Sequence, residues 1–282
     1  MLRLENLVKT FGALRAVDGV SIEIRPGEVF GLLGPNGAGK STTLAMAVGL
    51  TAPDSGRVEI TGHGSPTSPS SRRVLGIAPQ ALALYHDLTA EENLRFFGRL
   101  YGLRGSALKG RVDTVLAMVG LGDRRRDRVK TYSGGMQRRL NLAAALVHDP
   151  ALVLLDEPTA GVDPQSRNNI LDLVRLLASQ GRTIVYTTHY MEEAQKLCTR
   201  VGIIDKGRLL GVGTVDELIA RHGGKAVVTI ERDDGAERVE SDDPMVVVAK
   251  AAAAGGTLRG VRIDRPDLES VFLAMTGRRL RD

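Results

Sequence analysis

Short apolar runs alternate along this chain with segments whose apolar residues recur at helical spacing. Val29–Leu33 and Ala151–Leu155 are continuous apolar runs, as is typical of strands buried on both faces of a parallel sheet. Strands that alternate with helices predict an α/β fold, in which helices cover both faces of a parallel sheet. The further strands expected are at 74–78, 183–187 and 201–204, and the helices are at 41–50, 133–147 and 164–179.

Three other segments before about residue 130 depart from this alternation of strands and helices. Residues 2–24 and 57–60 carry short β patterns, which predict an antiparallel β subdomain. The stretch 62–71 is rich in Ser, Pro and Gly, so we expect a mobile loop there. Thr89 begins a capping box, and apolar residues at helical spacing follow it. An α-helical insertion is therefore expected at about 88–130.

The pattern changes after 221–224, where a second, smaller domain is expected to begin. We therefore place a large α/β domain at 1–222 and a small α+β domain at 223–282. The elements expected in the second domain are strands at 226–230 and 258–263 and helices at 245–254 and 268–275.

Composition narrows the class of protein. The chain has 282 residues, of which 43% are hydrophobic and 25% charged, and this is ordinary for a globular protein rather than a disordered one. No run approaches the roughly 18 apolar residues of a membrane helix, and we expect no signal peptide at the N-terminus. Cys198 is the single cysteine, which excludes an intramolecular disulfide and any multi-cysteine metal site.

The net charge of +5 is a mild excess, so we expect no nucleic acid among the partners. One basic cluster stands out, at Arg124–Arg128. It is either a solvated loop or a contact with a partner or an anionic membrane surface.

The clearest chemical signal is the segment Gly34–Ser41, which fits the pattern GxxxxGK[ST] between a buried strand and a helix. Its glycines let backbone N–H groups form a cradle for phosphate oxygens, and the helix N-terminus favours negative charge. Lys40 can reach the β- and γ-phosphates, and the Ser41 hydroxyl can bind Mg²⁺.

A second signal lies at the end of the apolar run 152–155, where Asp156 and Glu157 follow. Ligands of open α/β sheets bind at this carboxyl edge. Asp156 can hold Mg²⁺ through water, and Glu157 can act as general base toward an attacking water. Alone, the pair could equally be a solvated strand end.

A third signal is Ser133-Gly134-Gly135 at a predicted helix start. The segment offers backbone donors and a hydroxyl to an anion, although it could also be an ordinary Ser N-cap. Because one ATP needs only one phosphate cradle, this second one is expected to act on a nucleotide held by another copy of the chain.

These motifs, with Gln80, Asp163 and His189 in their order, resemble the nucleotide-binding subunit of an ABC transporter over about residues 2–219. The resemblance implies a P-loop NTPase core with the parallel sheet, antiparallel β subdomain and α-helical subdomain described above. It implies catalysis of ATP hydrolysis by Glu157, His189, Lys40 and Gln80, and Mg²⁺ bound by Ser41, Gln80 and Asp156. The nucleotide-binding residues it implies are Phe11, Val17, Gly34, Asn36, Gly37, Ala38, Gly39, Lys40, Ser41, Thr42, Gln80, Ser133, Gly134, Gly135, Asp156 and Asp163.

In this reading Phe11 stacks on adenine, supported by Val17, and His189 contacts the γ-phosphate. Without the other motifs, Phe11 could be a strand-end core residue, His189 a structural histidine and Asp163 a plain N-cap. Tyr132 stands where the family usually has Leu, and Met136 where it has Gln. Neither departure removes the Ser-Gly-Gly segment, so we expect activity to be kept.

The tail Pro266–Arg278 is similar to that of the daunorubicin-type, multidrug-resistance exporter branch, although locally it is also an amphipathic helix. The resemblance implies export of a drug, antibiotic or lipid-like compound, a separate polytopic membrane permease, a head-to-tail homodimer and a peripheral place on the cytoplasmic face of the membrane. The alternatives are an importer ATPase with a regulatory C-terminal domain, a soluble regulatory ABC ATPase acting on ribosomes or DNA, and a nucleotide-binding scaffold.

Overall fold

The computed structural model describes residues 1–255 and 257–277, in two compact units. The first unit is Met1–Val212 and the second begins at Gly213. The sequence had placed the boundary ten residues later. Helix α8 (Val215–His222) belongs to the second unit because it packs against α10 (Leu268–Thr276).

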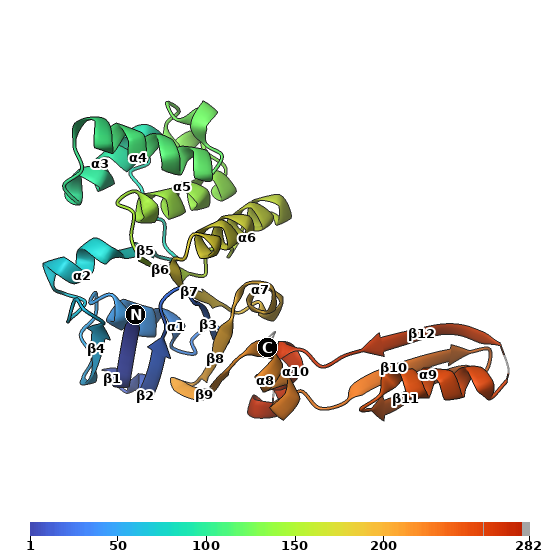
Figure 1. Ribbon diagram of the computed structural model, residues 1–282. Helices are drawn as coiled ribbons and strands as arrows, with labels where there is room; N and C mark the ends of the chain where they lie inside the picture. Colours follow the sequence, from blue (N-terminus) through green and yellow to red (C-terminus); the bar gives the residue numbers. More distant parts are fainter. Residues whose placement is uncertain (256, 278–282) are drawn as a thin grey trace. The chain divides into compact units, whose positions relative to one another are not determined.

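A six-stranded sheet forms the centre of the first unit, in the order β5-β6-β7-β3-β8-β9 (Figure 1). All residues of β3 and β6 are buried, as their continuous apolar runs predict. The pairs that join β5 to β8 in this order are parallel. The strands are β3 (Val29–Leu33), β5 (Leu75–Ala78), β6 (Leu152–Asp156), β7 (Thr183–Thr188), β8 (Arg200–Asp205) and β9 (Arg208–Gly213).

A second, antiparallel sheet has the order β2-β1-β4 and confirms the predicted β subdomain. Its strands are β1 (Leu2–Phe11), β2 (Leu14–Ile24) and β4 (Ser55–Ile60), and Figure 1 shows them beside helix α1 (Lys40–Ala47). One apolar core joins this sheet, α1 and the central sheet, through side chains such as Leu4, Leu44 and Leu154. The core therefore fixes α1, and with it the segment 34–40, against the end of β3.

The prediction of a loop over 62–71 is wrong for its last three residues, because helix α2 (Pro69–Val74) begins there. The Ser68 hydroxyl accepts a hydrogen bond from the Ser71 amide, and Pro69 occupies the first helical position. A serine N-cap followed by proline is a helix start signal, and the Ser/Pro composition masked it.

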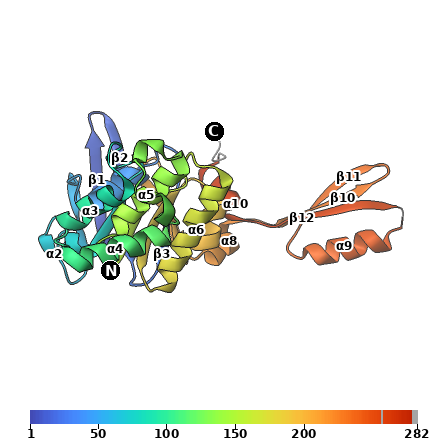
Figure 2. The same ribbon diagram turned by 90° about the horizontal axis from the view of Figure 1, so that it is seen from above.

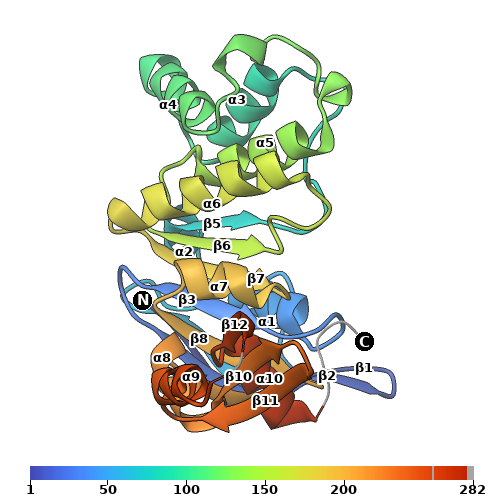
Figure 3. The same ribbon diagram turned by 90° about the vertical axis from the view of Figure 1, so that its right-hand side faces the viewer.

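The helical insertion is present as α3 (Ala90–Leu100), α4 (Gly105–Met118) and the 3₁₀ turns η1 (Gly122–Arg124) and η2 (Val129–Thr131). The predicted capping box forms between Thr89 and Glu92. Figure 3 shows α3 and α4 stacked over α5 (Gly134–Leu146), which in turn packs on β5. Two further helices, α6 (Pro164–Ser179) and α7 (Met191–Leu197), pack against β7.

The basic cluster 124–128 is partly used inside this insertion. The Arg125 guanidinium pairs with Glu91 of α3 at 2.8 Å and with Asp113 of α4 at 2.7 Å, and Arg124 pairs with Asp127. The cluster therefore joins α3, α4 and the turn after them. This structural role is neither the solvated loop nor the partner or membrane contact that the sequence suggested.

The second unit contains an antiparallel sheet of order β11-β10-β12 and a helix, α9 (Pro244–Ala253), that runs along it (Figure 2). The strands are β10 (Ala226–Arg232), β11 (Gly235–Ser241) and β12 (Leu258–Asp264). In α10, Val271 and Phe272 are buried, and Asp267 caps the helix by accepting a hydrogen bond from the Ser270 amide. Arg278, the end of the predicted tail motif, lies outside the described residues. Among the described residues, no helix is long and apolar enough to cross a membrane.

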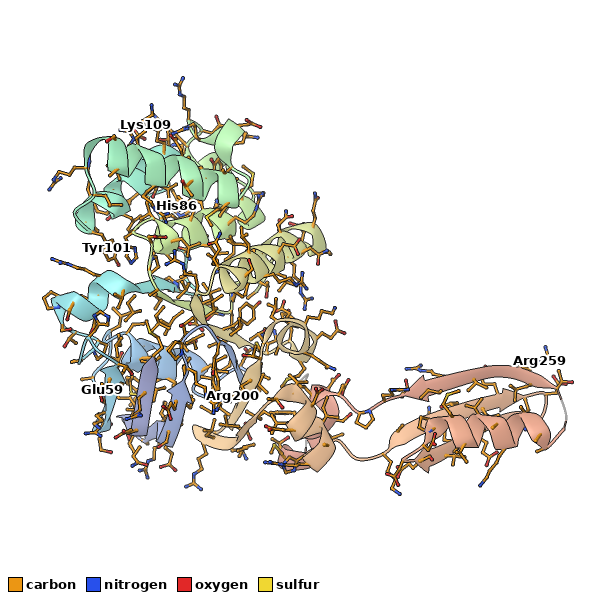
Figure 4. All side chains as sticks on the ribbon, in the orientation of Figure 1. Glu59, His86, Tyr101, Lys109, Arg200 and Arg259 are labelled. Atoms are coloured by element: carbon orange, nitrogen blue, oxygen red, sulfur yellow. The ribbon has the colours of Figure 1, made fainter. Side chains whose placement is uncertain are left out.

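A half-buried histidine is expected to make the first unit sensitive to acid. The His148 ring stacks on Tyr101, at the end of α3 (Figure 4), with ring centroids 3.5 Å apart, and its Nε2 lies 2.9 Å from the Leu75 carbonyl oxygen. Burial lowers the pKa of His148 to about 4. The neutral ring is therefore favoured in the fold, whereas the unfolded chain takes up a proton below about pH 6.5.

We expect the free energy of unfolding to fall by about 1–3 kcal/mol between pH 6.5 and pH 4, because His148 must be protonated or the fold must open. Urea unfolding at several pH values measures this. His148→Gln should flatten the pH dependence, and His86→Gln, a change at an exposed histidine, should leave it as it is. An equally steep loss in His148→Gln would contradict the assignment.

Candidate nucleotide-binding site

A cavity of about 600 Å³ lies over the carboxyl edge of the central sheet in the first unit. The segments that line it come from the β1–β2 hairpin, the loop after β3 with the start of α1, the segment after β5 and the segments that follow β6 and β7. Its lining residues are Phe11, Leu14, Ala16, Asn36, Gly37, Gly39, Lys40, Ser41, Thr42, Gln80, Glu157, Ala160, Gly161, His189 and Tyr190. Most of the residues predicted from separate motifs thus meet at one place.

Two glycines of the loop after β3 have no room for a side chain. A Cβ on Gly34 would lie 2.1 Å from the Ile204 carbonyl oxygen, and one on Gly39 would lie 2.4 Å from that of Ala16. Gly39 also has φ 104°, which L side chains rarely adopt. These positions let the loop curl tightly between β3 and α1, so that its amides and the start of α1 can face an anion.

Lys40 is almost completely buried at the centre of this loop. Its Nζ donates hydrogen bonds to the carbonyl oxygens of Gly34 at 2.8 Å and Pro35 at 2.9 Å. It also forms an ion pair with Glu157 Oε1 at 2.9 Å. The ammonium group is thus fixed inside the loop, and the carboxylate offsets the cost of burying its charge.

The groups suited to a magnesium ion lie next to this ion pair. The Ser41 hydroxyl donates to Asp156 Oδ1 at 3.1 Å, and the Thr187 hydroxyl donates to the same oxygen at 2.7 Å. Hydroxyl and carboxylate oxygens are the hard ligands that Mg²⁺ prefers. No group of three or more His, Cys, Asp or Glu side chains gathers elsewhere in the described part of the chain as a metal site. The donor set at Ser41 and Asp156 therefore fits an ion that keeps most of its ligands as water and phosphate oxygens.

Glu157 is held in a strained backbone conformation, with φ 44°. Its amide donates to the Thr187 hydroxyl at 2.9 Å. Its Oε2 accepts a weak hydrogen bond of 3.4 Å from Gln80 Nε2 and lies 3.2 Å from His189 Nδ1, which is not aligned for a hydrogen bond. Positive φ at a non-glycine residue costs about 1–3 kcal/mol and is concentrated at functional sites. The other three predicted catalytic residues, Lys40, Gln80 and His189, therefore converge on this one carboxylate.

The predicted adenine contact requires Val17 to line the cavity, but Val17 is not among the lining residues. It is fully buried in the core beneath β1 and β2, and its neighbour Ala16 lines the cavity instead, because successive side chains of a strand point to opposite faces. Gly34, Ala38 and Asp156 lie just behind the lining: Ala38 is buried, and Asp156 reaches the cavity through Ser41.

The second predicted anion site lies apart from this cavity. Ser133 caps α5, and its hydroxyl accepts a hydrogen bond from the Met136 amide at 3.3 Å. Ser133 and Gly134 are exposed, whereas Gly135 is buried against α6, where a Cβ would lie 2.0 Å from Ser166 Oγ. The segment therefore presents its first two residues to the outside of its own chain.

Asp163 lies with this second segment and not at the cavity. It caps α6, with Oδ1 accepting from the Ser166 amide at 2.9 Å, and hydrogen bonds from Ser166 hold the pKa of its carboxyl below the ordinary value. The Asp163 side chain thus stays ionised at the start of α6, beside Gly135.

One contact at the cavity has no signal in the sequence. Arg138 of α5 donates hydrogen bonds to the carbonyl oxygens of Gln80 and Ala160. Burial lowers the pKa of its guanidinium, which Asp156 and Glu157 oppose. Both acceptors are main-chain atoms, so no residue type in the sequence marks them, and the contact links the Ser133 helix to two edges of the cavity.

The sequence matches a known family model over part of this site. The model described as "ABC transporter" matches residues 17–160. The chain is 42% identical to the linearmycin resistance ATP-binding protein LnrL of Bacillus subtilis, and the match covers 100% of both chains. It is 40% identical to a Nod factor export ATP-binding protein I of Ralstonia nicotianae, over 100% of this chain and 95% of that protein. It is 38% identical to the daunorubicin/doxorubicin resistance ATP-binding protein DrrA of Streptomyces peucetius, over 98% and 92%.

Solved structures are similar to more than three quarters of the chain. An ATP-binding subunit of an ABC transporter aligns with a TM-score of 0.72 and 30% identity, over 79% of this chain and 93% of that one. A dimeric ATP-binding cassette in a post-hydrolysis state, bound to ADP and phosphate, aligns with a TM-score of 0.70 and 27% identity, over 76% and 98%.

Proposed function

The chain belongs to the ABC transporter family, in the drug-exporter branch of ATP-binding subunits, and from this membership we propose that it hydrolyses ATP to power export through a separate membrane permease. The observation that carries the proposal is the convergence of Lys40, Gln80 and His189 on Glu157, beside the Ser41–Asp156 pair. Relatives that match over nearly their whole length are named for antibiotic resistance or Nod factor export. A drug, antibiotic or lipid-like compound is therefore the class of cargo that we propose.

Within the cavity, each group has a proposed task. Phe11, half exposed at the β1–β2 hairpin, stacks on adenine, and the loop amides with Lys40 bind the phosphates. Ser41, Gln80 and Asp156 hold Mg²⁺, which supplies positive charge against the phosphate oxygens. Glu157 takes the proton of the attacking water, and His189 and Lys40 stabilise the charge that develops.

The active form is a head-to-tail homodimer in this proposal. The cavity is open to solvent, and Ser133 and Gly134 are exposed and do not line it in their own chain. A second copy would bring these residues to the open side, where the start of α5 faces the γ-phosphate. A dimeric relative bound to ADP and phosphate supports this arrangement.

An apolar groove in the first unit is the proposed contact with the permease, on the cytoplasmic face of the membrane. It has a volume of about 600 Å³ and lies between α2, β5 and the end of α3. Leu100 and Tyr101 on its rim are exposed, although large apolar side chains in a stable monomer are usually covered. The lining residues are Pro69, Arg72, Arg73, Leu75, Ile77, Phe97, Leu100, Tyr101 and Gly102.

Recovery of the chain from membranes tests this part of the proposal. The tagged chain, expressed in its native cells and purified in mild detergent, should bring down a polytopic membrane protein. Leu100→Glu should lower that recovery by about tenfold or more, because it places a charge in a desolvated apolar contact. Leu50→Glu, at an equally exposed leucine outside the groove, is the matched control. Equal recovery in both variants would exclude the groove, and recovery of no membrane protein at all would contradict the transport function.

A further inference from the structure

A buried carboxylate that the proposed chemistry does not use lies close to the site. Glu193, on α7, is 1% exposed and accepts four hydrogen bonds. Its Oε2 accepts from the hydroxyls of Thr159 at 3.0 Å, Tyr186 at 2.8 Å and Thr188 at 3.0 Å. Its Oε1 accepts from Arg167 Nε at 2.7 Å. The negative charge is therefore fully compensated, which is the condition for keeping an ionised group inside a protein.

The four donors come from segments that adjoin the catalytic groups. Thr159 is two residues after Glu157 and begins the loop that ends at Asp163. Thr188 immediately precedes His189, and Arg167 lies on α6, where its amide donates to the Asp163 carbonyl oxygen. One carboxylate thus ties together the loop after β6, the end of β7 and the start of α6.

Arg167 extends the network to the histidine itself. Its guanidinium lies over the Tyr190 ring, 4.5 Å from the centroid, and the Tyr190 ring lies 4.1 Å from that of His189. The Tyr190 amide also donates to the Thr188 hydroxyl at 2.9 Å. The His189 ring is otherwise weakly held, since its Nδ1 has no aligned hydrogen bond. Its orientation therefore depends on a chain of contacts that starts at Glu193.

We propose that Glu193 is a positioning residue for ATP hydrolysis, which holds His189 and the loop 159–163 in one fixed arrangement through Arg167 and the threonine hydroxyls. The inference rests on the proposed function, because it assigns a role in that same reaction. Glu193 touches neither nucleotide nor the reacting atoms, so its effect must appear in the turnover step and must pass through His189.

Glu193→Gln is the direct test, since it keeps the shape of the side chain and removes the charge that orients Arg167. We expect kcat of the full chain for ATP to fall about tenfold, with KM changed less than about twofold. Glu192→Gln, at the exposed neighbouring carboxylate, should leave kcat unchanged. A wild-type kcat in Glu193→Gln would overturn the proposal.

A double-mutant cycle separates positioning from a general loss of structure. In a His189→Ala background, Glu193→Gln should change the remaining kcat less than about twofold, because the residue acts through a side chain that is already absent. Losses that multiply in the double variant would show a merely structural role and overturn the proposal.

A second variant tests the proposal without changing a buried group, so that misfolding does not obscure the result. Tyr190→Leu removes the ring between Arg167 and His189 at a partly exposed position, and it should also lower kcat while leaving the thermal midpoint unchanged. A wild-type kcat in Tyr190→Leu would exclude the Arg167–Tyr190 route. An inactive wild-type chain would instead contradict the proposed function itself, so the two failures are distinguishable.

Discussion

Replacing Glu157 with glutamine is expected to lower ATP hydrolysis by about 10²-fold or more while ATP binding is retained. The amide has the size of the carboxylate, and its single oxygen can still accept a hydrogen bond from Lys40, which contacts one oxygen of Glu157. It cannot take a proton from water at neutral pH, and loss of a general base typically costs 10²–10⁴-fold. Phosphate release by the purified chain, with fluorescent-nucleotide binding measured alongside, checks both parts.

The same variant should trap the dimer. If hydrolysis is what separates the two copies, a hydrolysis-deficient chain in MgATP should elute and scatter light as a dimer. Lys40→Ala is the control: it removes the ammonium that binds the phosphates and should stay monomeric under the same conditions. Normal turnover in Glu157→Gln would rule out this carboxylate as the base, and a strictly monomeric variant saturated with MgATP would rule out the dimer.

The parts of the fold that could be predicted are those whose signal is local. The continuous apolar runs of β3 and β6 need no knowledge of partners, since only a strand covered on both faces is apolar throughout. The helix α6 was predicted with its observed bounds, because Asp163 and Pro164 form a complete start signal. The Gly34–Ser41 segment is similar, because its glycines act through the backbone of their own loop.

The parts that were missed depend on distant contacts. Strand β11 is almost wholly polar and exposed, so it has no apolar alternation, and only pairing with β10 defines it. Helices α7 and α8 were not predicted because they are short, and propensity alone gives little stability to a short helix. Glu193 was missed because its role depends on distant contacts. Its partners Thr159, Arg167 and Thr188 lie on three different segments of the chain.

The site shows the same division between local and distant signals. The residues of single motifs are local signals, whereas the distances between the motifs are not: Asp163, predicted with the nucleotide-binding residues, lies beside Gly135 at the start of α6. Ala16 lines the cavity and Val17 does not, and the register irregularities of β2 opposite β1 hide the phase of this strand from the sequence. Neither point can be read from residue types alone.

The second large effect expected is that two inactive variants become active when mixed. Gly134→Asp should abolish hydrolysis, because it places a carboxylate where another copy's phosphate would lie. An added Cβ at Gly134 meets no atom within 4 Å in its own chain, and an acid at a helix N-terminus is favourable for the fold. The loss would therefore come from nucleotide binding across the dimer and not from unfolding. Gly122→Asp, at another exposed glycine with no atom nearby, is the matched control and should keep its activity.

Mixing Gly134→Asp with Lys40→Ala separates the two possible geometries of the site. If each ATP lies between Lys40 of one copy and Gly134 of the other, a mixed dimer has one site with both defects and one intact site. Random pairing of equal amounts makes about half of the dimers mixed, so the mixture should recover about a quarter of the wild-type rate. If each chain enclosed its own nucleotide, mixing would restore nothing, because every cavity would still carry one of the two defects. Phosphate release at a series of mixing ratios decides between these outcomes, since the recovered rate should be maximal at equal amounts and vanish at either end.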